Sequence, residues 1–495
     1  MNKRESRDTP TPGKTSAPPR RADALDALRG FAILTMALSG LIPFGVLPAW
    51  MYHAQVPPPD HVFDAALAPP GLTWVDLVFP FFLFSMGASM PLALTRRIEK
   101  GESWWELAAY VAKRGFLLGA FAIYDQHIRP GGLAGHPGTS TWLLGLLGFG
   151  LLFPILARLP RSWRPTARWA IRAAGWAGAI ALMLCLRYPE DSRFGTEFSK
   201  ERSDIIILVL ANVAAFGSIA WLVSRRNLLL RLGFLGVLIA IRLSHDSVGW
   251  VKHLWDYSPA PWIYTLYYLQ YLFIVIPGTI VGDLLLTWMK TPADVVGTGG
   301  GWPRWRLSAI ATLAAGLVVL LLAGLQARWL PWTPIVAFVL CAVGWRLLAH
   351  PATACETLLN RLFAWGTYWL VLGLVFEPFE GGIKKDHPTM SYYFVTTGLA
   401  IFALIALAAL IDGLTGRRWI RLLIDNGQNP MIAYAGITNL LPPVLGLIGL
   451  ESLVQGLMRE WSLSPWWGVV WACAKTLMLA LAVSLCTRRG VFWRT

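Results

Sequence analysis

Charged residues are scarce in this chain of 495 residues, because Asp, Glu, Lys and Arg together make up only 14%. Hydrophobic residues make up 55%, and the mean hydropathy is +0.52. This composition excludes an ordinary soluble protein, which needs a more polar surface at this length. Apolar runs of about 17 to 25 residues recur along the chain, and each could cross about 30 Å of hydrocarbon as a helix. None shows the alternation of a membrane-barrel strand. The sequence therefore predicts an all-α, polytopic transmembrane helical bundle.

Cysteine is also rare, and its spacing fits neither a metal site nor a redox motif. The chain has five cysteines, an odd number: Cys185, Cys341, Cys355, Cys473 and Cys486. We therefore expect neither disulfides nor a bound metal. The glycine-rich stretch "GTGGGW" from Gly297 lacks the Gly-Lys-Ser/Thr ending of a phosphate loop, which argues against a nucleotide-hydrolysing module.

The formal net charge of +15 comes from short Lys/Arg clusters between the apolar runs. These clusters form no extended basic stripe with interleaved aromatics, so nucleic acid is not an expected partner. They fall in every second connection, as the positive-inside rule predicts for a bacterial inner-membrane protein with both termini in the cytoplasm. Residues 1–22 are rich in Pro, Ser, Thr, Lys and Arg and are expected to be a disordered basic cytoplasmic tail. Residues 23–495 then form the transmembrane domain.

Fourteen apolar ranges are candidate spans, and because the shorter ones could fall short of crossing, we expect roughly 11–14. They are 30–49, 73–94, 105–123, 141–158, 167–187, 204–222, 228–243, 260–288, 307–325, 333–349, 361–376, 390–412, 429–447 and 464–486.

Histidines are unevenly distributed over this topology. Only His350 falls in an inward connection. Seven fall in outward connections: His53, His61, His127, His136, His245, His253 and His387. Inward loops are equally polar, so this bias favours chemistry or recognition on the outer side.

Two long stretches carry a family pattern. "DALDALRGFAILTMAL" begins at Asp23, and "GLTWVDLVFPFFLFSMGASMPLAL" begins at Gly71. They resemble the heparan-alpha-glucosaminide N-acetyltransferase family, within the transmembrane acyltransferases. Its members pair L-D-x-x-R-G before one span with an outer H-A-x-W-N-G-L-T-x-A-D-L-V-F-P-x-F-x-F-x-x-G. The matching residues are Asp26, Arg29, Gly30, Gly71, Leu72, Thr73, Asp76 to Pro80, Phe82, Phe84 and Gly87.

Three further stretches extend the resemblance to about Leu447. "KRGFLLG" at Lys113 is similar to the family's basic start of a span. "GIKKDHPTMSYYFVTTG" at Gly382 resembles P-I-x-K-x-x-W-T-x-S-Y, and "NGQNPMIAY" at Asn426 resembles G-x-N-x-x-x-x-Y. Two segments depart from the family. The W-N-G is replaced by an insertion holding Pro57 to Pro59 and His61, and the asparagine at the outer end of the first span is replaced near Ser39-Gly40.

The resemblance implies acetyl transfer from cytoplasmic acetyl-CoA to a glycan or amino-sugar acceptor on the far side, with a histidine at the outer face. An imidazole can take the acceptor's proton or attack the thioester itself. His53 is the preferred candidate, because it lies at the expected distance from the first span and Ala54 follows it; His61 is the other. Asp76 could orient the imidazole, bind a sugar hydroxyl or cap a helix near Thr73.

Candidates for binding acetyl-CoA are Lys113, Arg114, Lys384 and Asn429, with Arg29 as a further site candidate. The orientation rule alone also explains Lys113 and Arg114, and a helix N-cap explains Asn429. Lys475 lies within the last span, where a charge needs a partner or a cavity. The alternative function is a transporter or flippase that uses Lys475 and Asp283. The expected partners are acetyl-CoA, the acceptor and the lipid bilayer, with a homo-oligomer possible.

Overall fold

A computed structural model describes residues 21–48, 51–53, 70–160, 162–246, 249–291, 300–414, 416–460 and 464–494. These residues are helical throughout apart from connections and one isolated bridge between Ala157 and Trp493. The expected all-α bundle is confirmed. The elements are α1 (Asp23–Leu41), α2 (Trp74–Ile98), α3 (Trp104–His127), α4 (Pro130–Leu133), α5 (Thr139–Leu156), α6 (Pro165–Cys185), α7 (Ile205–Ser224), α8 (Leu228–Ser244), α9 (Trp250–Asp256), η3 (Leu266–Tyr271), α10 (Leu272–Lys290), α11 (Arg304–Gln326), α12 (Trp332–Leu347), α13 (Ala354–Phe379), α14 (Met390–Ala408), η4 (Ala409–Gly413), α15 (Arg417–Gln428), α16 (Pro430–Asn439), α17 (Leu441–Leu447), α18 (Leu450–Glu460) and α19 (Trp466–Arg488).

Each of the fourteen predicted ranges coincides with a helix or a helix pair, but not all of them are long and apolar enough to span. Among the described residues, ten helices meet that standard, or eleven if α16 and α17, bent by 41°, count as one span. The other three are α6, α8 and α12. Helix α6 carries arginines at 168 and 172, whereas α8 has 17 residues and α12 has 16. The protein is therefore an integral, multi-pass membrane protein with a span count at the low end of the expected range.

The helices alternate in direction, so their termini gather at two ends of the bundle. At one end Lys290 pairs with Glu99, and Arg417 pairs with Asp23 at 2.8 Å. We call this the basic end. At the other, the Gly71 N–H donates to the Ile383 carbonyl at 2.8 Å, next to His53. We call this the His53 end.

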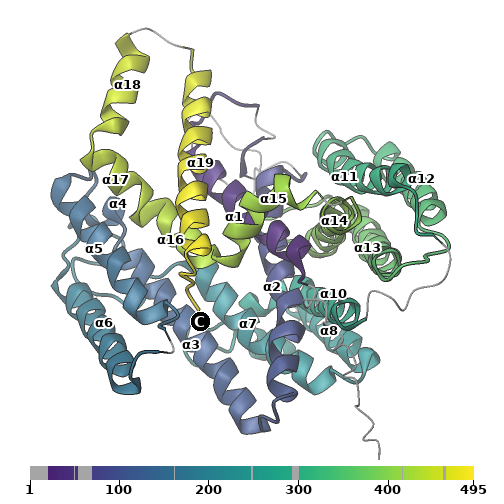
Figure 1. The fold of residues 1–495 in the computed structure, drawn as a ribbon, viewed down its shortest axis with the longest axis horizontal. Coiled ribbons are helices and arrows are strands. Elements are labelled where there is room, and N and C mark those ends of the chain that lie inside the picture. The colour runs from purple at the N-terminus through teal and green to yellow at the C-terminus, as the bar shows by residue number, and fades with distance from the viewer. Residues whose placement is uncertain are drawn as a thin grey trace, which may run out of the picture.

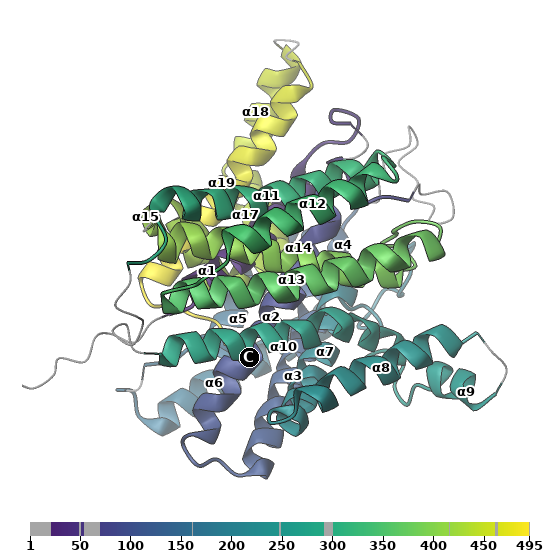
Figure 2. The same ribbon diagram turned by 90° about the vertical axis from the view of Figure 1, so that its right-hand side faces the viewer.

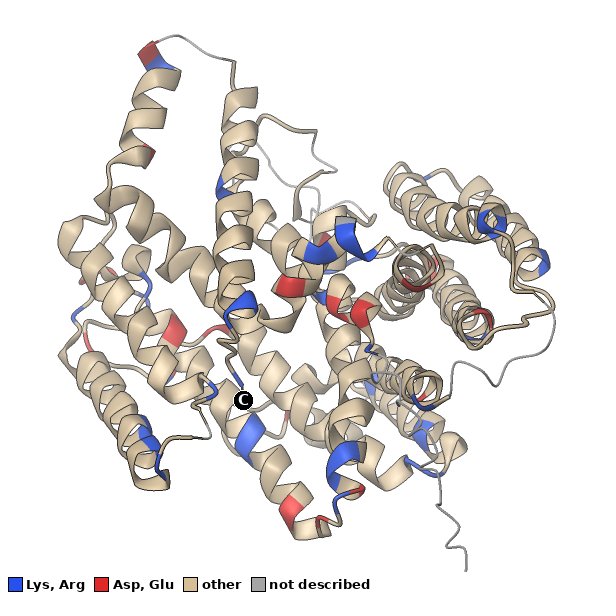
Figure 3. Ribbon diagram, viewed as in Figure 1, with Lys and Arg blue, Asp and Glu red and all other residues tan. Residues whose placement is uncertain are grey.

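The core lies around α14, which packs against α2, α11 and α13 (Figures 1 and 2). Its side chains are buried along nearly the whole helix, and Tyr392, Tyr393 and Phe394 are fully buried. Charged residues lie mostly near helix ends and leave long stretches of helix without charge (Figure 3). A helix buried on all sides cannot show an amphipathic stripe, which is why α14 reads in the sequence as a continuous apolar run.

The crossing of α1 and α15 brings two backbones into direct contact. A Cβ added to Gly30 would lie 1.9 Å from the Leu423 carbonyl oxygen, and one added to Gly427 would lie 1.7 Å from the Asp26 carbonyl oxygen. Only glycine fits at these positions. The crossing also fixes Asp26 and Arg29 against α15, where the candidate site begins.

We predict that Gly427→Ala destabilises the protein severely, because its Cβ would meet backbone that cannot move aside. Overpacking typically costs about 1–3 kcal/mol, and a backbone clash belongs at or above the top of that range. The matched control is Gly233→Ala in α8, where an added Cβ meets nothing within 4 Å. In detergent, the melting temperature should fall strongly for Gly427→Ala and should not fall for the control. Equal melting temperatures would contradict the close backbone contact between α1 and α15.

Candidate functional site

A partly open cavity of about 250 Å³ runs along one face of α2. The α2 residues on its wall recur every three or four positions, which is the spacing of a single helix face. They are Phe79, Phe82, Met86, Ser89 and Ala93. At about 1.5 Å per residue they cover about 21 Å of the helix axis. The same face continues to Asp76 at the His53 end and to Arg97 at the basic end, so it connects two polar clusters through an apolar interior.

Helices α1, α3, α7 and α16 complete the walls of this cavity. Ile33, Leu118 and Leu210 contribute apolar surface, and Tyr434 contributes a hydroxyl. The Tyr434 hydroxyl donates to Asp204 at 2.7 Å. The walls that these helices contribute are therefore mainly apolar.

Basic side chains surround the cavity at the basic end. Arg29, Arg114 and Arg494 line it directly. A second cavity of about 400 Å³ shares Tyr110 and Arg494 with the first. Its other basic residues are Arg97, Lys113 and Arg172. The predicted pair Lys113 and Arg114 thus joins four arginines from separate segments, an arrangement suited to phosphate groups.

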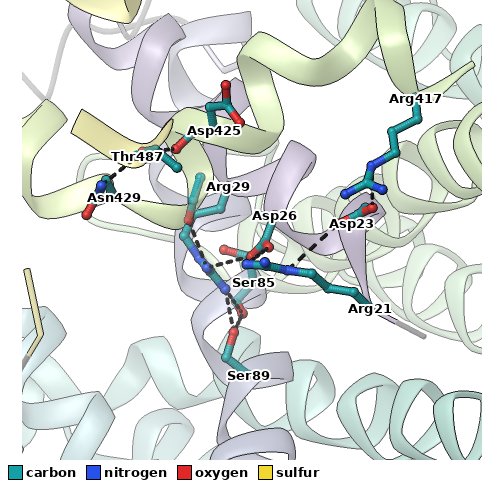
Figure 4. Close-up of polar contacts among 11 residues, drawn as sticks. Arg21, Asp23, Asp26, Arg29, Ser85, Ser89, Arg417, Asp425, Asn429 and Thr487 are labelled. Carbon is teal, nitrogen blue, oxygen red and sulfur yellow. Dashed lines mark hydrogen bonds and ion pairs between the residues drawn. The ribbon is translucent and has the colours of Figure 1, made fainter. Parts of the chain in front are cut away.

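Arg29 is held in place by backbone and hydroxyl groups (Figure 4). Its guanidinium donates to the Gly427 carbonyl at 3.0 Å, to the Ser85 carbonyl at 3.3 Å and to the Ser89 hydroxyl. It also pairs with Asp26 at 3.3 Å. These contacts explain why arginine stands at this position: its planar group satisfies acceptors on three helices while one edge faces the cavity.

Asn429 stands at the N-cap position of α16, as one interpretation of the sequence expected, but its side chain makes no capping hydrogen bond and is turned to the C-terminal segment. Its amide donates to Thr487 Oγ1 at 2.9 Å (Figure 4) and to the Val491 carbonyl at 2.7 Å, and its Oδ1 accepts from the Trp493 N–H at 3.2 Å. Asn429 is 1% exposed. It therefore positions Arg494 on the cavity wall, and all its polar atoms have protein partners.

His53 lies at the opposite end, in contact with three charged side chains. Its Nδ1 is 2.9 Å from Asp76 Oδ1 and 3.0 Å from Lys385 Nζ, and its Nε2 is 3.0 Å from Asp386 Oδ2. The His53 side chain is 41% exposed, so the ring is reachable from outside. The structure thus brings together the two residues predicted as catalytic, His53 and Asp76.

Asp76 shows two of the three functions that the sequence left open: it caps a helix and contacts the imidazole, while binding of a sugar hydroxyl stays a prediction. Its Oδ2 accepts from the Thr73 N–H at 3.0 Å and from the Thr73 hydroxyl at 2.9 Å, while the Asp76 N–H donates to Thr73 Oγ1. This is a capping box at the start of α2. Its other oxygen contacts His53, so the helix cap holds the imidazole in one orientation.

Lys385 was missed by the sequence analysis, which named its neighbour Lys384. When the isoleucine of the family pattern P-I-x-K is aligned with Ile383, the lysine of the pattern falls on Lys385. The pattern could therefore have identified this residue. Lys385 contacts His53 and lies 3.8 Å from Asp76. The Lys384 N–H donates to Thr389 Oγ1 at 3.1 Å, at the His53 end. The structure therefore does not bring Lys384 together with Lys113 and Arg114.

The charges around His53 determine its protonation. Burial lowers the pKa of His53, but the carboxylates of Asp386 and Asp76 outweigh this effect, so that the net pKa is raised above 6.5 despite the opposing charge of Lys385. Without a ligand, the two carboxylates thus favour the protonated form of the imidazole.

His127 and Lys475 lie apart from His53. His61 lies outside the described residues. His127 is buried against Phe198, and its Nδ1 contacts the Ile123 carbonyl at 2.7 Å, which makes it a core histidine. Lys475 pairs with Glu451 at 3.3 Å.

The Tyr434 hydroxyl belongs to a polar cluster that the sequence analysis did not anticipate. Arg129 pairs with Asp204 and with Asp125 at 2.8 Å, and Asn439 donates to Asp125 at 2.9 Å. These residues come from α3, α16 and two connections, so no local sequence motif predicts that they meet.

Two comparisons with known proteins bear on this arrangement. The family described as "Domain of unknown function (DUF5009)" matches residues 21–285, more than half of the chain, and the chain belongs to this family. The human protein named heparan-alpha-glucosaminide N-acetyltransferase is 34% identical over 110 residues. That segment is 22% of this chain and only 14% of the human protein.

We predict that His53 stabilises the protein in a pH-dependent way. Because its folded pKa is raised, its contribution is fully present below the unfolded pKa of about 6.5 and is lost as the pH rises through the folded pKa. The difference in melting temperature between wild type and His53→Gln should therefore be largest at acidic pH and shrink with rising pH. His136→Gln, at an exposed histidine, serves as the control. A difference that grows with pH would contradict the two-carboxylate arrangement.

Proposed function

We propose that this member of the DUF5009 family transfers an acetyl group from cytoplasmic acetyl-CoA to a glycan or amino-sugar acceptor on the other side of the membrane. The basic end would face the cytoplasm, and the His53 end would face the acceptor. The main support is the single face of α2, whose cavity-lining residues lie between Arg97 in the basic cavity and Asp76 beside His53.

The distribution of charge along the cavity fits the parts of acetyl-CoA. Its phosphates cannot enter hydrocarbon, and Lys113, Arg114 and Arg494 provide cations where they would stop. Its pantetheine arm is slender and largely uncharged, which suits the apolar wall formed by Phe82, Met86 and Leu118. The thioester would thereby approach His53 while the nucleotide stays at the basic end.

The contacts of His53 assign different roles to its two nitrogens. Asp76 is buried in a helix cap and holds Nδ1, which leaves Nε2 on the reactive side of the ring. Nε2 could take a proton from the acceptor while the acceptor attacks the thioester, or it could attack the thioester and carry the acetyl group. Both routes need the same cavity and the same imidazole.

The alternative, a transporter or flippase, has one structural feature in its favour. Helices α16 and α17 form a span bent by 41° near Asn439, and broken spans are common at the binding sites of transporters. The charges expected to couple transport have separate partners: Lys475 pairs with Glu451, and Asp283 pairs with Arg231. Binding of CoA distinguishes the two functions.

We predict that CoA raises the melting temperature of the purified protein and that labelled acetyl-CoA is turned over in the presence of amino sugars or oligosaccharides. A ligand at 100 times its Kd stabilises by about 2.7 kcal/mol. Arg114→Gln should weaken the CoA effect, and Ala93→Trp should abolish it by filling the cavity beside Ser89. Val319→Trp is the matched control, because Val319 is 65% exposed on α11. If CoA neither stabilises the wild type nor loses its acetyl group, the proposed function is wrong.

We also predict opposite accessibility for the two ends. In a background whose five native cysteines are replaced by alanine, a cysteine at Asp246 should react with an impermeant thiol reagent from outside intact cells. A cysteine at Lys100 should react only after the cells are opened. Both positions are exposed. The reverse labelling pattern would place the acceptor in the cytoplasm and would contradict the proposed direction of transfer.

A further inference from the structure

The Nε2 side of His53 faces a second carboxylate, which the orientation of the ring does not require. Asp386 Oδ2 lies 3.0 Å from Nε2, whereas Asp76 contacts Nδ1 on the other side of the ring. The two acids differ in exposure: the side chain of Asp76 is 1% exposed, and that of Asp386 is 32% exposed. Asp386 is therefore the more exposed of the two acids, although its Oδ2, the oxygen beside Nε2, is itself enclosed next to the ring.

The connection that carries Asp386 is anchored on both sides. Glu380 accepts from the N–H groups of Met390 and Ser391 at 2.6 and 2.8 Å, which closes the segment into a compact turn at the start of α14. The Ile383 carbonyl accepts from Gly71 at 2.8 Å, next to the cap that holds Asp76. The position of Asp386 relative to His53 is thus set by the same segments that orient the ring.

The two carboxylates differ in their hydrogen-bond partners. Both oxygens of Asp76 are occupied, one by Thr73 and the other by His53. With the imidazole protonated, Asp386 is the partner of the Nε2–H; once Nε2 has lost its proton and reacts, the carboxylate stays beside the reactive nitrogen without this hydrogen bond. If Nε2 carried an acetyl group, it could no longer pair with Asp386, and this carboxylate would lie next to the acetyl carbon. A base at that place can take the proton of an attacking amine or hydroxyl.

We propose that Asp386 is the general base of a second half-reaction, in which the acceptor takes the acetyl group from His53; this rests on the proposed function. The acceptor's nitrogen or oxygen forms a bond to the acetyl carbon. The bond from that carbon to Nε2 breaks, and its electron pair returns to the imidazole. The acceptor's proton passes to the Asp386 carboxylate and then to water. The first half-reaction, in which Nε2 forms a bond to the acetyl carbon and displaces CoA as a thiolate, does not require Asp386.

The experiment measures the two half-reactions separately in the full-length protein. Exchange of label between acetyl-CoA and free CoA without acceptor reports the first, and acetylation of glucosamine or its oligosaccharides reports the second. Asp386→Asn should keep exchange within about twofold and lower acceptor acetylation by about 10²- to 10⁴-fold. His53→Ala should lose both. Asp246→Asn is the matched control, because Asp246 also pairs with a histidine, His245, at 3.2 Å, outside this site.

Each other outcome overturns the assignment. If Asp386→Asn lowers both reactions equally, Asp386 only holds His53; if it lowers neither, Asp386 is not the base. If the wild type acetylates acceptors without exchange, transfer is direct: the half-reaction is wrong, while the proposed acetyltransferase stands. If the wild type shows neither reaction, the proposed function fails first. Should Asp386→Asn not fold, Asp386→Glu keeps the carboxylate and should retain exchange with slower transfer; loss of exchange in that variant would overturn the proposal.

Discussion

The first turn of α2 is the constraint on which the site depends. Asp76 closes the capping box with Thr73 and holds His53 with its remaining oxygen. A carboxylate near a helix N-terminus is also favoured by the helix dipole, which helps to keep a buried anion ionised. Because the cap fixes where α2 begins, it also fixes which face of α2 lines the cavity. One local hydrogen-bond pattern thereby holds the His53 ring and begins the helix that lines the cavity.

The distribution of buried charge follows from the cost of placing ions in a low-dielectric interior. An isolated charge there is expensive, so the embedded charges have partners on neighbouring helices. Asp283 binds Arg231 and Trp221, and Lys475 binds Glu451. These pairs satisfy their own charges locally. Arg114 and Arg494 differ, because they face open volume in which Arg29, itself paired with Asp26, adds a further cation. An excess of positive charge in one place is what an anionic ligand would require, and local pairing would remove it.

Periodicity and apolarity suffice for the fold, because each span is a local run of sequence. The fourteen predicted ranges agree with the helices, and only length and composition reduce the number that can span. The core of the site was also predictable: His53 and Asp76 are separated by a short connection, and a motif follows the histidine. The rest depends on contacts between distant segments. Lys385 and Asp386 reach His53 from more than 300 positions away, and Arg494 is held at the cavity by Asn429. No spacing rule reports such contacts, and for Asn429 the local pattern of asparagine before proline indicated a helix cap instead.

The two ends of the bundle have opposite electrostatic character, and an apolar stretch of α2 keeps them apart. At the basic end several cations face the same volume, which suits a polyanion. At the His53 end two carboxylates face one imidazole and one lysine, which suits the transfer of a proton. If these clusters lay close together, the arginines would pair with Asp76 and Asp386, and neither cluster would keep its chemistry. The apolar residues of α2 from Leu77 to Phe84 prevent this. Along the helix axis about 13.5 Å separates Asp76 from Ser85, the first α2 residue that Arg29 contacts, so the two clusters do not pair directly.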